Sequence, residues 1–276
     1  VVLTGGVGGA KLVLGLQQVL PSERITAIVN TGDDFRHLGL HISPDVDTLL
    51  YTLSGKANKK QGWGREDESW SFMAALRELG GEDWFALGDH DLALHIVRTA
   101  RLASGVTLSA ITADFARAWG IGATIMPMSE QPVATHVRTA RGWIEFQHYF
   151  VRQRCEPIVH GIAFQGATEA LPAPGVVSAI IQAEVILIAP SNPLLSIDPL
   201  LAVPGIRAAL AEASAPVVAV SPIIGGQAIK GPTAKLMKEM GQEVSNTAIA
   251  RHYQGVIDGL VIDTGDEAPE GIAIER

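Results

Sequence analysis

The chain opens with Val1-Val2-Leu3-Thr4-Gly5-Gly6-Val7-Gly8-Gly9-Ala10-Lys11. This stretch joins a short apolar run to a turn with four glycines in five residues, and an apolar-periodic segment follows over residues 10–20. The order predicts a strand, a glycine turn and the N-terminus of a helix, which together bind phosphate on backbone N–H groups. We therefore expect phosphate binding here; the alternative is a turn whose glycines only let helix and strand pack closely.

The glycine turn differs from two commoner nucleotide-binding motifs. A dinucleotide fingerprint counted from Gly6 would need glycine where Lys11 stands. It would also need an acidic residue after the second strand, where this chain has Asn30. A P-loop requires Gly-Lys-Ser/Thr, whereas Lys11 lies between Ala10 and Leu12. The sequence therefore supports neither ordinary nicotinamide binding nor ordinary ATPase chemistry.

Four carboxylates follow within 40 residues of the turn. Asp33 and Asp34 come after an expected strand at residues 25–29, and Asp45 and Asp47 fall in the first turn of an expected helix at 44–53. Carboxylates there complement the helix dipole, so capping alone is one reading. A phosphate-binding turn beside four carboxylates favours nucleotide chemistry assisted by a metal ion.

Composition narrows the class of protein. The 276 residues are 47% hydrophobic and 18% charged, enough for one large α/β domain or two small ones. A net charge of −8 argues against nonspecific binding to nucleic acid. The single cysteine, Cys155, excludes a disulfide framework. Neither a membrane-spanning run nor a signal peptide is visible, so we expect a soluble cytoplasmic protein.

Alternating apolar runs and helical patterns predict a Rossmann-like parallel sheet flanked by helices. The expected strands are 1–3, 25–29, 184–189, 216–220 and 260–263. The expected helices are 10–20, 44–53, 71–79, 91–102 and 108–119. A hairpin pattern at 136–151 interrupts this order, so we expect a nucleotide-binding domain at 1–55 and 167–276 and an inserted α+β domain at 56–166 on the acceptor side.

Three further segments carry polar residues. Gly88-Asp89-His90-Asp91 precedes His95 and Arg98 on an expected helix, where capping by Asp89 and a solvated face is the alternative to function. Ser191 and Asn192 follow the strand at 184–189, where ligands of open α/β sheets bind. A glycine-rich loop follows the strand at 216–220, and its Lys230, with Lys235 beyond it, is a candidate for phosphate.

Together these motifs resemble the 2-phospho-L-lactate transferases of coenzyme F-420 biosynthesis over essentially the whole chain. The resemblance implies transfer of a phosphoenolpyruvyl or phospholactyl group from a guanosine-diphosphate-linked donor to the deazaflavin riboside Fo, with release of GMP and use of magnesium. The double-glycine turn looks like the bacterial, phosphoenolpyruvate type. A homodimer is also implied.

The resemblance assigns roles residue by residue. It implies contact with Fo by Asp47, Ala86 and Asp89. The guanosine nucleotide would be held by Gly5, Gly6, Gly8, Gly9, Lys11, Asn30, Ser191, Asn192 and Gly225. Because phosphoryl transfer depends on positioning and charge neutralisation, we also expect catalytic roles for Asp45 and Asp47, and magnesium binding by these two with Asp33 or Asp34.

Two departures and two alternatives remain. His90 stands where family members usually have arginine, and Glu130-Gln131 replaces a pair of aspartates. One alternative is a non-catalytic regulatory protein that binds a nucleotide sugar, and the other is an unrelated nucleotidyltransferase. Trp63, Trp84 and Phe85 are expected to border an apolar slot for the acceptor, although core packing is the favoured interpretation of each tryptophan taken singly.

Overall fold

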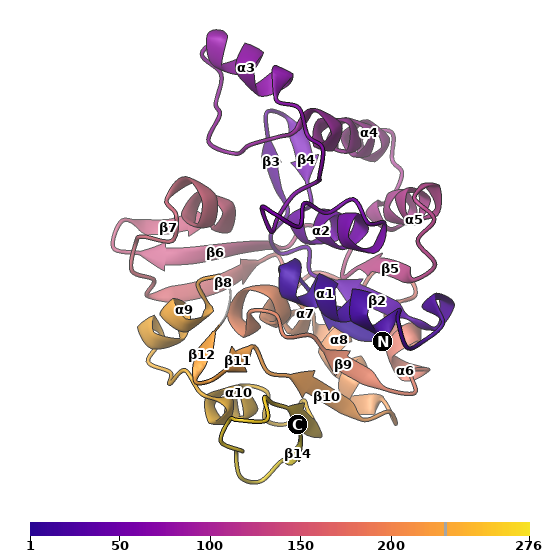
Figure 1. Cartoon of the computed structure of the whole chain (residues 1–276), viewed down its shortest axis with the longest axis vertical. Helices are drawn as coiled ribbons and strands as arrows, with labels where there is room; N and C mark the ends of the chain where they lie inside the picture. The colour runs from indigo at the N-terminus through magenta and orange to yellow at the C-terminus, as the bar shows by residue number, and fades with distance from the viewer. Residues whose placement is uncertain (229–230) are drawn as a thin grey trace.

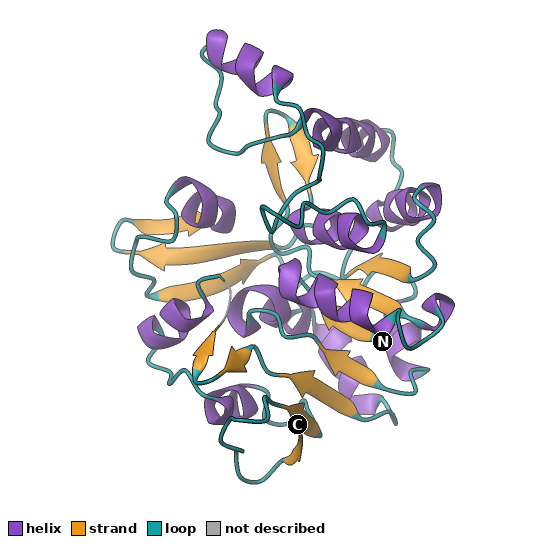
Figure 2. Ribbon diagram, in the orientation of Figure 1, coloured by secondary structure: helices purple, strands orange, loops and turns teal. Residues whose placement is uncertain are grey.

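The computed structural model describes residues 1–228 and 231–276 and confirms the α/β prediction. Seven parallel strands form the central sheet in the order β14-β13-β10-β9-β1-β2-β5, with helices on both faces (Figures 1 and 2). Their bounds are β1 Val2–Thr4, β2 Thr26–Val29, β5 Thr124–Pro127, β9 Ile186–Ile188, β10 Val217–Val220, β13 Gly259–Val261 and β14 Ala273–Glu275.

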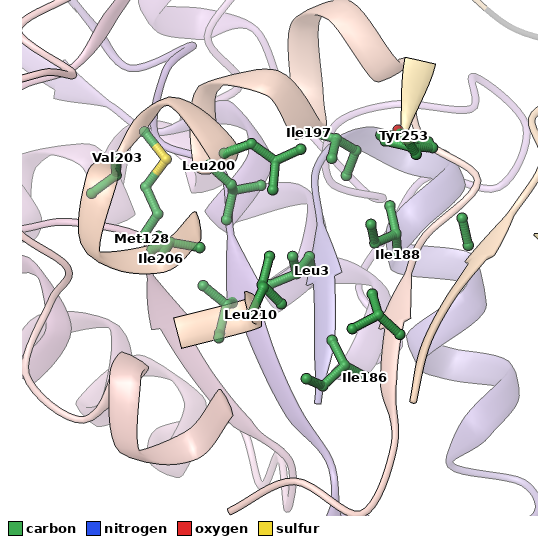
Figure 3. Close-up of a cluster of buried hydrophobic side chains, with 14 of the residues drawn as sticks. Leu3, Met128, Ile186, Ile188, Ile197, Leu200, Val203, Ile206, Leu210 and Tyr253 are labelled. Atoms are coloured by element: carbon green, nitrogen blue, oxygen red, sulfur yellow. The ribbon is translucent and has the colours of Figure 1, made fainter. Parts of the chain in front are cut away.

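Alternate strand residues bury into the helical layers on opposite faces of the sheet. Val2 and Ala27 join a core with α1 (Gly6–Leu16), α2 (Pro44–Leu53) and α5 (Leu108–Ala118). Leu3 and Ile28 join the larger core on the other face (Figure 3). The elements of that layer are α6 (Val176–Ile181), η3 (Pro193–Ile197), α7 (Asp198–Ala202), α8 (Pro204–Glu212), α9 (Thr233–Glu239) and α10 (Asn246–His252).

Helix α1 begins at Gly6 and ends at Leu16, whereas the sequence pattern predicted residues 10–20. The glycines were expected to form a turn, but most of them lie inside the helix. A short helical turn, η1 (Ser22–Arg24), then leads into β2. Helix α2 follows its predicted bounds, with Pro44 at its first position. Ser43 occupies the N-cap position of α2, but its hydroxyl does not cap the helix and instead donates a 2.7 Å hydrogen bond to Asp34.

The middle of the chain departs from the sheet. The hairpin of β3 (Phe35–His37) and β4 (Leu40–Ile42) was not predicted. Beside it in Figure 1 lies α4 (Asp89–Ala103), and α3 (Ser71–Glu78) lies above both, farthest from the sheet. A second antiparallel sheet has the order β7-β6-β8. Its bounds are β6 Ala134–Thr139, β7 Gly142–Glu145 and β8 Gly161–Gln165.

Two expectations for this region fail. The second hairpin strand was expected to reach residue 151, but residues His148–Arg152 form a π-helical turn, η2, which buries Tyr149. The domain division at 56–166 does not hold for β5, which pairs in parallel with β2 in the central sheet. Strand order depends on pairing between distant segments, which the local pattern does not encode.

The remaining strands are short: β11 (Ile223–Ile224) and β12 (Gln227–Ala228) form a hairpin in the glycine-rich loop. No single helix in the described ranges is both long enough and apolar enough to cross a membrane; the segments Pro193–Ala202 and Pro204–Glu212, bent by 85°, meet that criterion only as a pair and only by length and composition.

Candidate active site

In the central sheet β1 lies between β9 and β2, so these three strands end side by side. The candidate site lies at their carboxyl ends. The backbone N–H of Asn30, after β2, donates to the carbonyl of Thr4 at 2.9 Å. The Ser191 hydroxyl, after β9, donates to the carbonyl of Gly5 at 2.7 Å. Three predicted motifs are therefore joined at one edge of the sheet, which is where ligands of such sheets bind.

Close packing explains three of the four glycines in the turn. A Cβ added at Gly5 would lie 2.5 Å from Asp45 Oδ2, and one at Gly8 would lie 2.7 Å from the Pro190 carbonyl oxygen. A Cβ at Gly9 would overlap the hydroxyls of Thr4 and Ser191. The packing explanation is thus correct for these positions, and it brings the N-terminus of α1 close to the loop after β9.

Gly6 has a different reason to be glycine. Its φ of 62° lies in the left-handed region, which side chains disfavour. Helix α1, which starts there, has neither a side-chain cap nor an acidic residue in its first turn. Its N-terminus therefore presents the positive end of the helix dipole to negative charge from elsewhere in the site.

Asp45 is the carboxylate nearest to this helix N-terminus. Asn30 Nδ2 donates to Asp45 Oδ2 at 2.9 Å, and the Gly6 backbone N–H also hydrogen-bonds the carboxylate. Burial nevertheless raises the pKa of Asp45 to about 6, against these two opposing hydrogen bonds. The ionised form is therefore under-solvated, which suits it to bind a cation.

Asp33 and Asp34 are two further carboxyl groups close to Asp45. Burial, with the nearby charge of Asp45, raises the pKa of Asp33 well above its usual range, and burial also raises the pKa of Asp34. Asp34 Oδ2 accepts from Ser43 and lies 3.1 Å from His41 Nε2. The other oxygen of Asp34, like Asp33 Oδ1, is buried with no hydrogen-bond partner among the described residues.

Further unpaired polar atoms lie at the same strand ends. Thr4 Oγ1, Thr31 Oγ1 and Asn192 Nδ2 are also buried without a partner in the described part of the chain. An unpaired buried polar group costs about 1–3 kcal/mol, so such groups are normally satisfied by water or a ligand. Their concentration here indicates a site for a strongly polar ligand.

Arg98 is a member of the site that sequence reasoning did not assign. It lies on α4, is fully buried, and pairs through both terminal nitrogens with the two oxygens of Asp47. His95 Nδ1 lies 3.7 Å from Asp47 Oδ2. The spacing of Asp91, His95 and Arg98 does predict one helix face, but nothing local identifies Asp47 as the partner.

Other predicted site residues lie farther from this centre or have defined partners. Asn192 Oδ1 accepts from the N–H groups of Leu194 and Leu195, which caps η3. Gly225 has a φ of 60° in the β11–β12 turn. Lys11 is exposed on α1. Lys235 donates to the Pro157 carbonyl and pairs with Glu239 rather than facing the strand ends, and Lys230 lies outside the described residues.

Asp89 has a structural role that accounts for its carboxylate. It accepts hydrogen bonds from the Ser69 hydroxyl and from the backbone N–H groups of Ser71 and Phe72, at the N-terminus of α3. Glu68 in turn accepts from the N–H groups of His90 and Asp91 at the N-terminus of α4. Asp89, the first residue of α4, thus caps α3, and Glu68, just before α3, caps α4.

The expected acceptor slot is narrow in this structure. A cavity of about 10 Å³ is bordered by Trp63, Trp70, Ala86 and Asp91. That volume is about the size of one water molecule, so a tricyclic ring would require movement of the segment that carries the two tryptophans. Trp84 packs with its indole ring 5.0 Å from His37 and 4.5 Å from His148, so the core reading fits it.

The carboxylates at the strand ends are the candidate ligands for magnesium in this site. Within residues 1–228 and 231–276, no group of three or more His, Cys, Asp or Glu side chains is arranged to hold a metal ion. Magnesium, however, commonly uses one or two carboxylates together with substrate phosphates and water. Asp33 and Asp45 fit that pattern, since both are buried, Asp45 is close enough to raise the pKa of Asp33, and Asp33 Oδ1 has no partner among the described residues; both Asp47 oxygens are instead engaged by Arg98.

Comparison with known proteins places the chain in one family. The family model described as 2-phospho-L-lactate transferase CofD matches residues 1–275. A phosphoenolpyruvate transferase of Streptomyces griseus is 47% identical, over 96% of this chain and 86% of the relative. A 2-phospho-L-lactate transferase of Methanosarcina mazei is 42% identical, over 100% of this chain and 90% of the relative.

Solved structures agree on the fold. A UPF0052 family protein from Bacillus halodurans superposes with a TM-score of 0.63 at 19% sequence identity, covering 97% of this chain and 80% of that one. At 19% sequence identity, this likeness shows the fold and says nothing about activity. The family model and the two transferases cover nearly the whole chain, which is therefore a transferase belonging to the 2-phospho-L-lactate transferase CofD family.

Proposed function

We propose that the protein transfers a phosphoenolpyruvyl or phospholactyl group from a guanosine-diphosphate-linked donor to the terminal hydroxyl of Fo, releasing GMP, in coenzyme F-420 biosynthesis. The observation that carries the proposal is the set of unpaired, buried polar atoms at the ends of β1, β2 and β9, beside the N-terminus of α1, whose first turn carries no acidic residue. Family membership supplies the reaction class.

The diphosphate of the donor would lie against the N-terminus of α1. Backbone N–H groups and the helix dipole stabilise phosphate charge there. Ser191 and Asn192 border the same edge, and the unpaired Asn192 Nδ2 is a donor for a phosphate or ribose oxygen. Gly8 and Gly9 serve this arrangement because they let Pro190 and Ser191, in the loop after β9, lie against α1.

Asp33 and Asp45 would hold the magnesium ion, whose chemistry is to neutralise the charge of the diphosphate. The two carboxylates are already costly to ionise in this buried position, so a divalent cation relieves their desolvation. Asn30 orients Asp45 through its 2.9 Å hydrogen bond.

Asp47 would accept a hydrogen bond from the attacking hydroxyl of Fo. The hydroxyl oxygen forms a bond to the β-phosphorus, the bond from that phosphorus to the bridging oxygen breaks, and GMP leaves with that oxygen. The hydroxyl proton is released to solvent or to a carboxylate. Phosphoryl transfer depends mainly on positioning and charge stabilisation, so a fully formed alkoxide is not required.

The test is incubation of the protein with Fo, magnesium chloride and enolpyruvyl- or lactyl-diphosphoguanosine, followed by mass spectrometry of the deazaflavin and quantification of GMP. We expect one phospho-acid to be added to Fo for each GMP released. Donor binding without any product would instead support a regulatory nucleotide-binding protein. A cytoplasmic homodimer belongs to the same proposal and is tested by light scattering and by cell fractionation.

A further inference from the structure

Buried polar side chains link α2 to α4 around Asp47, the residue proposed to accept a hydrogen bond from the Fo hydroxyl. Arg98 Nη1 donates to Asp47 Oδ2 at 3.0 Å, and Nη2 donates to Asp47 Oδ1. Arg98 Nη1 also lies 3.4 Å from the His41 carbonyl oxygen. Both partners are buried, Arg98 at 0% exposure and Asp47 at 4%. A fully buried guanidinium is costly unless it is paired in this way.

A second contact joins the same two helices. His95, one turn before Arg98 on α4, places Nε2 3.2 Å from Asp91 Oδ2. The Tyr51 hydroxyl donates to the other oxygen of Asp91. Tyr51 lies one turn after Asp47 on α2, so α2 is bonded to α4 through both of these residues. The rotation of α2 against α4, and with it the direction of the Asp47 carboxylate, is fixed at two levels.

We propose that Arg98 is a positioning residue for the acceptor: it fixes the Asp47 carboxylate by a bidentate pair so that the remaining lone pairs meet the attacking hydroxyl in line with the donor. This inference rests on the proposed function. A planar guanidinium holds both oxygens of a carboxylate in one plane, whereas an ammonium holds it as a point charge. If the Asp47 carboxylate could rotate freely, it would misdirect the attacking hydroxyl of Fo even with the charge of the carboxylate unchanged.

The test compares Arg98→Lys with Arg101→Lys in the full chain. Arg101 is on the same helix and pairs with Asp114 at 2.6 Å, but at a partly exposed position away from Asp47. We expect Arg98→Lys to lower kcat with Fo by about tenfold to a hundredfold, because a displacement of about 1 Å costs that much. GDP affinity, measured by calorimetry, should stay within about twofold of wild type. Arg101→Lys should match the wild-type kcat.

As a control for loss of folding, the melting temperature of each variant is measured and kcat is scaled to the folded fraction. A second variant pair, Asp47→Asn alone and Asp47→Asn with Arg98→Lys, gives an independent readout: since Arg98 acts through Asp47, the double variant should be no slower than Asp47→Asn. Wild-type turnover by Arg98→Lys, or additive losses in the double variant, would overturn the positioning role of Arg98 and leave the proposed function standing. A wild-type protein that makes no product would remove the proposed function as well.

Discussion

Asn30, after β2, donates a 2.9 Å hydrogen bond from its side-chain amide to Asp45 Oδ2 in the first turn of α2. The bond joins the second strand to the helix that carries the acidic pair. A Cβ at Gly5 would come within 2.5 Å of the same oxygen. Asp45 is therefore held between the end of one strand and the start of α1, and its burial follows from the absence of a side chain at Gly5.

Asp45→Asn should stabilise the protein near neutral pH. Burial raises the pKa of Asp45 from 3.8 to about 6, so the folded state must bear the cost of an ionised buried group above about pH 6. A shift of about two units corresponds to roughly 3 kcal/mol, and this cost disappears below about pH 4, where the group is protonated in both states.

The measurement is urea unfolding of wild type and Asp45→Asn from pH 4 to pH 8. The stabilisation by Asp45→Asn should grow as the pH rises from about 4 to about 6 and should then level off. Asp114→Asn is the matched control: hydrogen bonds from Arg101 and Arg117 lower the pKa of Asp114, so this variant should show no gain at neutral pH. Equal stability of Asp45→Asn and wild type at pH 8 would contradict the prediction.

Two glycines of α1 should respond to alanine in opposite directions. Gly9→Ala places a Cβ against the Thr4 and Ser191 hydroxyls, so we expect a loss of about 1–3 kcal/mol in the free energy of unfolding. Gly15 has no atom within 4 Å of an added Cβ, so Gly15→Ala should gain about 0.5–1 kcal/mol through helix propensity.

Chemical denaturation of both α1 variants checks this pair. If Gly9→Ala were as stable as wild type, the close packing between α1 and the loop after β9 would be disproved. The same measurement with GDP present separates packing from binding, because a ligand stabilises only a protein whose site is intact.

Asp47→Asn should lose both stability and turnover. Without the carboxylate, Arg98 keeps a buried charge with a weaker partner, so we expect a loss of about 3 kcal/mol in the free energy of unfolding. If Asp47 only capped the helix, which is the alternative interpretation of the sequence, the loss would be about 1 kcal/mol or less. Product formation per folded molecule should fall by a factor of about a hundred or more. Turnover close to wild type, after correction for the folded fraction, would exclude a role for Asp47 in the reaction.

Local sequence was enough to predict the elements that depend on local pattern. The strand at Thr26–Val29 and the helix at Pro44–Leu53 follow from an apolar run and from a proline start. Strand β5 was missed because Thr124–Pro127 is short and ends in proline, and its place beside β2 depends on a distant partner. The division of the chain at 56–166 was wrong at β5 for the same reason.

The site shows the same limit. Clustered glycines and aspartates within the first 47 residues pointed to the strand ends, because parallel strands bring their carboxyl ends to one edge. The pairing of Arg98 with Asp47 joins residues 51 positions apart, and its geometry depends on how α4 crosses α2. Helical spacing predicted the face of α4 but not its partner, and it did not separate a capping from a binding role for Asp89.

The last prediction concerns that role of Asp89. Because its carboxylate accepts from the N–H groups of Ser71 and Phe72, Asp89→Ala should speed amide hydrogen exchange throughout α3 without affecting β1 or β2. Helix α3 buries only Met73, so little else holds it in place. Asp83→Ala is the matched control, since Asp83 pairs with Arg77 at 2.8 Å and leaves the helix N-terminus untouched. Equal exchange in both variants would show that the cap does not hold α3. An intact α3 in Asp89→Ala combined with a higher KM for Fo would instead identify Asp89 as an acceptor contact.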